Sequence, residues 1–566
     1  FSVSSVGEFA GSLFWVILIS LSLSWLTAVT TTPLLCAMFI KPDKKAEGQE
    51  ESDPYAGMLF QGYKKLLLVA LRFRWVTVAI VVALFVSAII GFAYVKQGFF
   101  PDSNTPMFFV DIWEVEGTDI RHTRDDALQV EKFLSEQEGV VSTTTMVGGG
   151  AMRFTLVYGP EAATSAYAQL IVKVENKKQI EALQEKVTEF MRVELPNTEP
   201  KVKNLRIGPG RDSKIEARFS GPDPKVLREL SEKAQSIMFA DSDARDIRDD
   251  WRQPVKVIRP LFNEQVGLQL GISRAELTDA LKRSSVGTSV GAFRDGNRLL
   301  DIVLRAPEDE RDDVAKLQDI QIYSPVLGRS IPAGQVITDV ETVWENNIIR
   351  NRNRAHTIIA SANPIGPLAS PLFNRLRPQI EAIPLPSGYM LEWGGEYEDG
   401  INASKPLFAA LPGGFILMII ASILLFGHIR QPLIIWLVVP MAIIGITAGL
   451  LLTGGAFDFM AMLGGLSLVG LLIKNAIVLI EEIDLQKEQG KELFQAIVES
   501  SVARMRPVLM AASTTILGLI PLLVDVFFMN MSIAIMAGLG FATILTLVII
   551  PVLYAIFFKA ENRELA

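Results

Sequence analysis

Long runs of apolar residues constrain the fold of this chain more than any other feature. A helix needs about 20 apolar residues to cross the roughly 30 Å hydrocarbon core of a bilayer. Runs of suitable length lie at about 12–40, 75–96, 407–427, 432–453, 459–483, 508–524 and 532–558. The sequence therefore predicts a polytopic α-helical membrane protein with seven membrane-spanning helices in this chain.

One of these helices carries a lysine near its middle, Lys474. A charge at this depth costs about 2.5–3.5 kcal/mol even on lenient insertion scales, so such residues usually have a function. Helical spacing places the lysine in a stripe of mostly small and polar residues, Ser467, Gly470, Lys474, Val478 and Glu481. We expect this stripe to face other helices and not lipid. The alternative is a lysine that bends out to the headgroups.

The basic residues of the loops orient the bundle. The 41–74 and 484–506 loops are rich in Lys and Arg, whereas the 454–458 and 525–531 loops have none. By the positive-inside rule the basic loops are cytoplasmic, so the 97–406 segment lies outside the cytoplasm. We therefore expect a bacterial inner (cytoplasmic) membrane protein with a large periplasmic loop.

Two smaller features of the cytoplasmic side are also predicted. Within the first basic loop, residues 41–53 form a charged linker and residues 55–73 an amphipathic helix on the membrane face. Residues 483–503 form a second cytoplasmic helical stretch.

The external segment repeats a strand–helix–strand pattern. The first round has strands at 107–115, 140–146, 154–158, 169–174 and 201–207, and helices at 123–136 and 178–193. The second round has elements at 214–219, 224–239 and 247–251, and resumes at 355–361, 368–383 and 389–393. This order predicts ferredoxin-like βαβ subdomains of α+β type. An insert at about 254–350, with a capping box formed by Ser273 and Glu276, suggests a separate small domain.

Composition and missing motifs exclude several function classes. A formal net charge of -8 argues against a nucleic-acid partner, and the single cysteine, Cys36, excludes an internal disulfide. The three histidines are scattered, so no metal site is expected, and no other cofactor is indicated. A Walker A sequence is absent, and Gly148, Gly149 and Gly150 precede no helix, which predicts a turn and not a phosphate cradle. The sequence therefore contains no motif that indicates an enzyme.

The runs 474–481 (KNAIVLIE) and 504–510 (RMRPVLM) resemble the resistance-nodulation-cell division (RND) superfamily. Within it they are similar to the hydrophobe/amphiphile multidrug efflux pumps of the acriflavine-resistance (AcrB-like) type. Segments 31–37 (TTPLLCA), 98–101 (GFFP) and 385–389 (LPSGY) support the resemblance, which extends over nearly the whole chain. It implies that the chain is the carboxyl-terminal half of a twelve-helix pump.

The resemblance also implies a domain division and partners. In the membrane, residues 1–40 would be family helix six, 75–97 helix seven and 407–566 helices eight to twelve, with the cytoplasmic linker and amphipathic helix at 41–74. Outside it, residues 98–210 would form the first porter subdomain, and 211–253 with 351–406 the second. Residues 254–350 would form the docking subdomain. The implied assembly is a homotrimer with a periplasmic adaptor protein and an outer-membrane channel. It would use the proton motive force to export amphiphilic small molecules, including antibiotics.

Residue by residue, Lys474 matches the membrane lysine of the family's proton relay, whose carboxylate partners lie on a helix outside this chain. Asn475 and Arg504 also match positions near the relay, although packing and a cytoplasmic anchor are equal alternatives. Ala511 stands where many members have a relay threonine. A hydroxyl from residues 513–515 would substitute, with Thr514 as the candidate.

Residues 147–154 resemble the family's switch loop beside the drug pocket. The expected pocket residues are Gly148, Gly149, Gly150, Phe154 and Tyr158. The two aromatic side chains would present apolar and amphipathic faces to a bulky substrate. The alternative is that they belong to an ordinary strand core.

Three other functions remain open at this point. Another branch of the superfamily exports metal ions, but the 17 methionines are dispersed and form no ladder. An exporter of envelope lipids would share the same architecture. A non-transporting membrane scaffold or secretion accessory would have no use for a buried lysine.

Overall fold

Seven helices long and apolar enough to cross a membrane are present in the computed structural model, which describes residues 5–39, 57–155, 157–208, 212–307, 314–366 and 368–560. The predicted linker at 41–53 lies outside the described residues. The chain divides into two compact units, of which the second runs from Trp251 to Ile349. The insert predicted at about 254–350 covers nearly the same residues.

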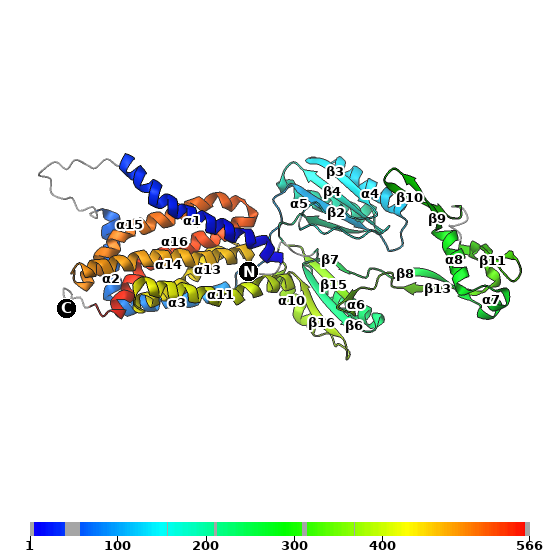
Figure 1. The fold of residues 1–566 in the computed structure, drawn as a ribbon. Helices are drawn as coiled ribbons and strands as arrows, with labels where there is room; N and C mark the ends of the chain where they lie inside the picture. Colours follow the sequence, from blue (N-terminus) through cyan, green and yellow to red (C-terminus); the bar gives the residue numbers. More distant parts are fainter. Residues whose placement is uncertain are drawn as a thin grey trace. The chain divides into compact units, whose positions relative to one another are not determined.

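The membrane helices confirm the predicted spans (Figure 1). They are α1 (Ser5–Phe39), α3 (Arg74–Phe92), α11 (Glu396–Phe426), α12 (Arg430–Val438) continued by α13 (Ala442–Thr453), α14 (Phe459–Glu488), α15 (Leu493–Leu519) and α16 (Val526–Phe557). The amphipathic helix is α2 (Met58–Arg72), which buries Leu67, Ala70 and Leu71.

The ends of the last three helices differ from prediction. The stretch predicted as a separate cytoplasmic helix at 483–503 belongs to α14 and α15, which a short turn separates. The last helix begins at Val526 and not at 532, because the Asp525 side chain accepts a hydrogen bond from the Phe527 N–H and caps the helix earlier.

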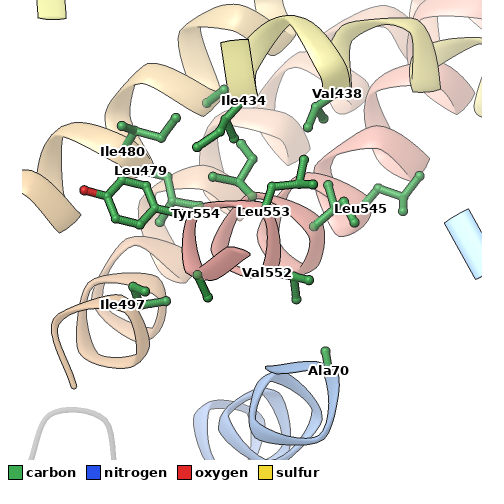
Figure 2. Packing of buried hydrophobic residues seen from close by; sticks show 14 of the residues in the cluster. Ala70, Ile434, Val438, Leu479, Ile480, Ile497, Leu545, Val552, Leu553 and Tyr554 are labelled. Atoms are coloured by element: carbon green, nitrogen blue, oxygen red, sulfur yellow. The ribbon is translucent and has the colours of Figure 1, made fainter. Parts of the chain in front are cut away.

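Helix α16 forms the core of the bundle. Leu545, Val552 and Leu553 of this helix pack against residues from α12, α14 and α15, including Ile434, Val438, Leu479, Ile480 and Ile497 (Figure 2). On α13, a Cβ added at Gly445 would lie 2.5 Å from the Ala537 carbonyl oxygen of α16. The small residues at this crossing thus allow the two backbones to approach closely.

The first external subdomain is a four-stranded antiparallel sheet with two helices. Its elements are β2 (Met107–Trp113), α4 (Ile120–Ser135), β3 (Val140–Val147), β4 (Tyr167–Val174), α5 (Ile180–Glu194) and β5 (Glu199–Asn204), with strand order β3-β4-β2-β5. Alternate residues of β2, Phe108, Val110 and Ile112, pack against both helices. The extra strand predicted at 154–158 is wrong: none of the described residues between β3 and β4 belongs to a strand.

The second external subdomain repeats the same topology around the insert. Its elements are β6 (Ile215–Gly221), α6 (Pro224–Phe239), β7 (Ala244–Asp249), β14 (Asn351–Arg352), β15 (Ala355–Pro364), α10 (Ser370–Glu381) and β16 (Met390–Gly395). The strand order is β14-β15-β6-β16, and β7 also pairs with β15. Both subdomains are therefore ferredoxin-like, as predicted.

The second unit contains its own small core. Its elements are β8 (Val255–Phe262), α7 (Glu264–Leu270), α8 (Arg274–Ser285), β9 (Thr288–Asp295), β10 (Arg298–Leu304), β11 (Gln321–Ser324), β12 (Arg329–Pro332) and β13 (Ile337–Glu345). The predicted capping box at the start of α8 is confirmed, with Ser273 and Glu276 bonded reciprocally.

Two short strands pair at the ends of membrane helices, and one of them is hydrogen-bonded to the second subdomain. Strand β1 (Lys96–Gln97) follows α3 and pairs with β17 (Ala456–Phe457), which precedes α14. The Ser370 hydroxyl, at the start of α10, donates to the Gln97 carbonyl oxygen at 2.7 Å.

Candidate functional site

The stripe that contains Lys474 forms the uncovered face of α14. Ser467, Gly470, Lys474 and Glu481 are exposed, whereas Leu468, Leu472, Ala476 and Leu479 on other sides of the helix are buried. A Cβ added at Gly470 would meet no atom within 4 Å. The stripe therefore points away from the other helices in the described part of this chain.

Lys474 and Asn475 lie on different sides of this helix. Within the described residues, the Lys474 ammonium group makes no hydrogen bond or ion pair. The Asn475 side chain is only 8% exposed, so it lies on the packed side of the helix. The two predicted relay residues are thus neighbours in sequence without sharing a face.

The other two predicted relay residues lie on α15. The Arg504 guanidinium donates to the Glu482 carboxylate, which also accepts from the Gln486 side chain. This ion pair joins α14 to α15, which fits the cytoplasmic-anchor alternative. The Thr514 hydroxyl is exposed and donates to the Ala511 carbonyl oxygen of its own helix at 3.0 Å.

The glycine-rich loop connects β3 to β4 (residues 148–166). Gly148 has a φ of +82°, which favours glycine, and its N–H donates to the Tyr167 carbonyl oxygen. At Gly150 an added Cβ would lie 2.8 Å from the Glu161 backbone nitrogen, so the two arms of the loop are in close contact.

The two aromatic residues of this loop differ from each other in exposure. Phe154 is 46% exposed, but Tyr158 is only 7% exposed. Their ring centroids are 4.8 Å apart, and the Tyr158 ring stacks on Phe109 of β2 at 5.6 Å. Of the two rings, only Phe154 is therefore accessible from solvent.

A buried polar network lies beneath the glycine-rich loop, and the sequence reasoning missed it. The Asp111 carboxylate accepts from the Tyr167 hydroxyl (2.9 Å) and the Gln169 amide (2.8 Å). It also pairs with the Lys203 ammonium at 2.5 Å, and Lys203 in turn reaches Asp212 at 3.0 Å. Asp111 and Gln169 are fully buried, which makes satisfied hydrogen bonds essential here.

The network's charges compensate one another. Burial alone would raise the pKa of the Asp212 carboxyl, but the Lys203 and Lys201 ammonium groups hold that pKa well below its usual value. Burial likewise lowers the pKa of Lys201, whose side chain is 2% exposed and lies 2.6 Å from Asp212. Two carboxylates and two ammonium groups thus pair with one another on the side of the sheet opposite the helices.

A separate group of three side chains of metal-ligating types lies near the start of α4. Glu114, His122 and Asp126 each place a ligand atom within 4.8 Å of the others. Burial, followed by repulsion from Asp126, raises the pKa of Glu114 to about 7. The spacing of His122 and Asp126 was readable from the sequence, but the return of the chain from β2 brings Glu114 beside them. The scattered histidines gave no indication of this group, and the expectation that the chain has no metal site stays a prediction.

A membrane bundle of this kind joined to two ferredoxin-like external subdomains defines the RND transporter fold. The chain belongs to the AcrB/AcrD/AcrF family, which matches residues 4–558. It is therefore a multi-pass protein of the inner membrane, in a family of transporters and not enzymes.

Several relatives show how varied this family is. The cobalt-zinc-cadmium resistance protein CzcA of Cupriavidus metallidurans is 26% identical over 363 residues, 62% of this chain and 34% of the relative. The swarming motility protein SwrC of Bacillus subtilis is 20% identical over 97% of this chain and 52% of its own length. The toluene efflux pump membrane transporter TtgB of Pseudomonas putida is 24% identical over 89% of this chain and 49% of its own length.

A crystal structure of a heavy metal efflux pump has the same fold, with a TM-score of 0.76 and 21% identity. The match covers 88% of this chain and 52% of that structure. The chain thus spans about a third to a half of the length of the relatives it matches.

Proposed function

We propose that the full-length protein is a proton-driven exporter of hydrophobic and amphiphilic compounds, a secondary active transporter. It would work as a homotrimer together with a periplasmic adaptor protein and an outer-membrane channel. The observation that carries this proposal is the position of Lys474 on the uncovered face of a membrane helix. A charge at that position requires a partner in the membrane, and helices outside this chain would supply it.

The proposed mechanism is electrostatic. Ionised carboxylates on those helices attract Lys474 and hold α14 in one position. Protonation of the carboxylates removes this attraction, and the helices shift to a second arrangement. Proton entry from the periplasm thereby biases a two-state bundle, and the external subdomains alternate between binding and release.

The half-exposed Phe154 ring supports amphiphilic compounds as substrates. It contacts the Tyr158 ring within the glycine-rich loop at a tilted angle, and 46% of the residue remains exposed. Aromatic rings of this kind bind bulky apolar groups without requiring a fixed geometry.

The proposal is tested by the accumulation of ethidium in pump-deleted cells that express the full-length protein. Wild-type cells should exclude the dye only while the proton gradient stands, and Lys474→Met cells should fill like the empty strain. Lys487→Met is the matched control, because it removes a lysine from the exposed cytoplasmic end of the same helix. This control should pump normally at equal membrane expression.

Normal pumping by Lys474→Met would contradict the relay role. Dye exclusion that survives an uncoupler would contradict the proton drive. If wild-type cells never exclude the dye, amphiphilic compounds are the wrong substrate class.

Divalent metal ions are the second candidate substrate. Relatives named for metal resistance and the cluster of Glu114, His122 and Asp126 favour this candidate. Imidazole and carboxylate groups are suitable ligands for zinc and cobalt. The same cells would then survive added Zn²⁺ or Co²⁺ and contain less of it, and His122→Ala would reduce this protection while leaving ethidium export unchanged.

A further inference from the structure

We propose that Gln169 is the positioning residue that fixes the glycine-rich loop, and that it thereby selects which substrates bind tightly. This inference rests on the proposed export function, since the loop carries the exposed Phe154 ring. Gln169 itself is fully buried in β4, so it acts through the loop and not by touching a substrate.

One oxygen atom of Gln169 holds two separate points of the loop. Its Oε1 accepts the Ala151 N–H at 3.0 Å and the Tyr158 hydroxyl at 2.6 Å. Ala151 lies at the start of the loop and Tyr158 near its middle, so a single acceptor folds the chain back between them. These donors are buried, and each would lose its acceptor if the amide were absent.

The orientation of the Gln169 amide is fixed from the other side. Its Nε2 donates to Asp111 Oδ1 at 2.8 Å, and an ionised carboxylate accepts hydrogen bonds but cannot donate them. Asp111 also pairs with the Lys203 ammonium through its other oxygen, Oδ2. The amide must therefore turn its NH₂ group to Asp111 and its oxygen to the loop.

The effect reaches the surface through stacked rings. Tyr158 is anchored by its hydroxyl on Gln169, and its ring contacts both Phe109 and the half-exposed Phe154, whose own centroids are 6.2 Å apart. If the loop lost its hydrogen bonds to Gln169, the Tyr158 ring could tilt, and the orientation of the exposed Phe154 ring would change with it. Substrates that depend on this aromatic surface would then bind more weakly, whereas the proton relay in the membrane would be unaffected.

The first measurement is amide hydrogen exchange of purified full-length protein. In Gln169→Leu, exchange in peptides covering residues 148–155 should be about 5- to 30-fold faster, since buried donors lose their acceptor. Tyr158→Phe removes only one of the two bonds and should give a smaller increase. Tyr167→Phe is the matched control: it removes only a side-chain hydrogen bond to the same Asp111 and keeps the Tyr167 carbonyl that accepts the Gly148 N–H, so loop exchange should equal wild type.

Unchanged loop exchange in Gln169→Leu overturns the inference. If Gln169→Leu does not fold, the Tyr158→Phe variant tests the inference in its place. Loop exchange at the wild-type rate in Tyr158→Phe would then overturn the inference. This measurement needs no transport, so it stands apart from the success or failure of the proposed function.

The second measurement concerns selectivity. In proteoliposomes, Gln169→Leu should raise the KM for rhodamine 6G more than for the smaller ethidium and keep the maximal rate, whereas Lys474→Met should abolish the rate for both dyes. Faster loop exchange with unchanged KM values would overturn the role in selectivity. If the wild type moves neither dye, the proposed function fails, while the exchange result still decides whether Gln169 holds the loop.

Discussion

The two external sheets have the same strand order but use their polar residues for different tasks. In the first sheet, Asp111, Gln169 and Lys203 connect to one another and hold the glycine-rich loop. In the second sheet, the buried Arg218 of β6 donates to Glu216 of its own strand and to Glu398 in the first turn of α11. One network therefore fixes a loop, and the other fixes the start of a membrane helix.

The difference shows that two subdomains of the same fold can use their buried charges for different structural roles. Arg218 is only 1% exposed and lies across Gly394, where an added Cβ would meet its guanidinium group. Arg352 also donates to Glu398, so two cations hold the α11 carboxylate. The second sheet is thus joined by ion pairs to the first turn of α11, whereas the first sheet holds the glycine-rich loop.

The largest effect is expected for Arg218→Met. The substitution removes the buried cation that pairs with Glu216 and Glu398, and the removal of one partner from a buried ion pair costs about 3–5 kcal/mol. Thermal unfolding of the purified full-length protein should show this loss, and hydrogen exchange should rise at the start of α11. If exchange rises in the glycine-rich loop and not at the start of α11, the proposed difference between the two networks is wrong. Arg377→Met, which removes an exposed ion pair with Glu381, is the control.

A smaller effect is expected for Lys203→Met in the first sheet. Asp111 loses its cation, but Tyr167 and Gln169 still donate to it, so we expect about 2–3 kcal/mol. Exchange should increase in residues 148–155 and stay at wild-type rates in α11. An equal increase in both regions would show that the two networks are not independent.

The smallest effect concerns pH and Asp250, at the end of β7. Burial raises the pKa of this carboxyl to about 6 from its model-compound value of 3.8. The folded state therefore binds the proton more tightly, and the free energy of unfolding should fall by about 1–3 kcal/mol as pH rises from about 4 to about 6. Asp250→Asn should remove this part of the pH dependence. An identical pH profile for the variant and wild type would contradict the assignment.

The sequence predicted the helices and the two sheets well, because their signals are local. Membrane spans follow from the lengths of apolar runs, and α6 was predicted with its observed bounds, Pro224–Phe239. The strand at 154–158 was wrong because the aromatic residues Phe154 and Tyr158 suggested a strand core. These side chains instead stack on Phe109 from a loop whose backbone is held by Gln169.

The candidate site was predicted in part. The pattern around Lys474 predicted a stripe that faces other helices; the stripe is exposed within the described part of this chain, so that contact stays a prediction. The partner of Arg504, Glu482, lies on a different helix, and no local pattern reveals it. The network beneath the loop left a readable signal, because Asp111, Lys201 and Lys203 alternate with apolar residues in their strands.

The pairing of β1 with β17 has a consequence for the order of assembly. These strands are roughly 360 residues apart, so at about 5–20 residues per second the ribosome needs roughly 20–70 s to make the partner of β1. Gly91 near the end of α3 packs against Thr447 and Leu451 of α13, which is also made late. During that interval α3 must reside in lipid without these neighbours, and its almost wholly apolar sequence suits it to a period as a solitary membrane helix.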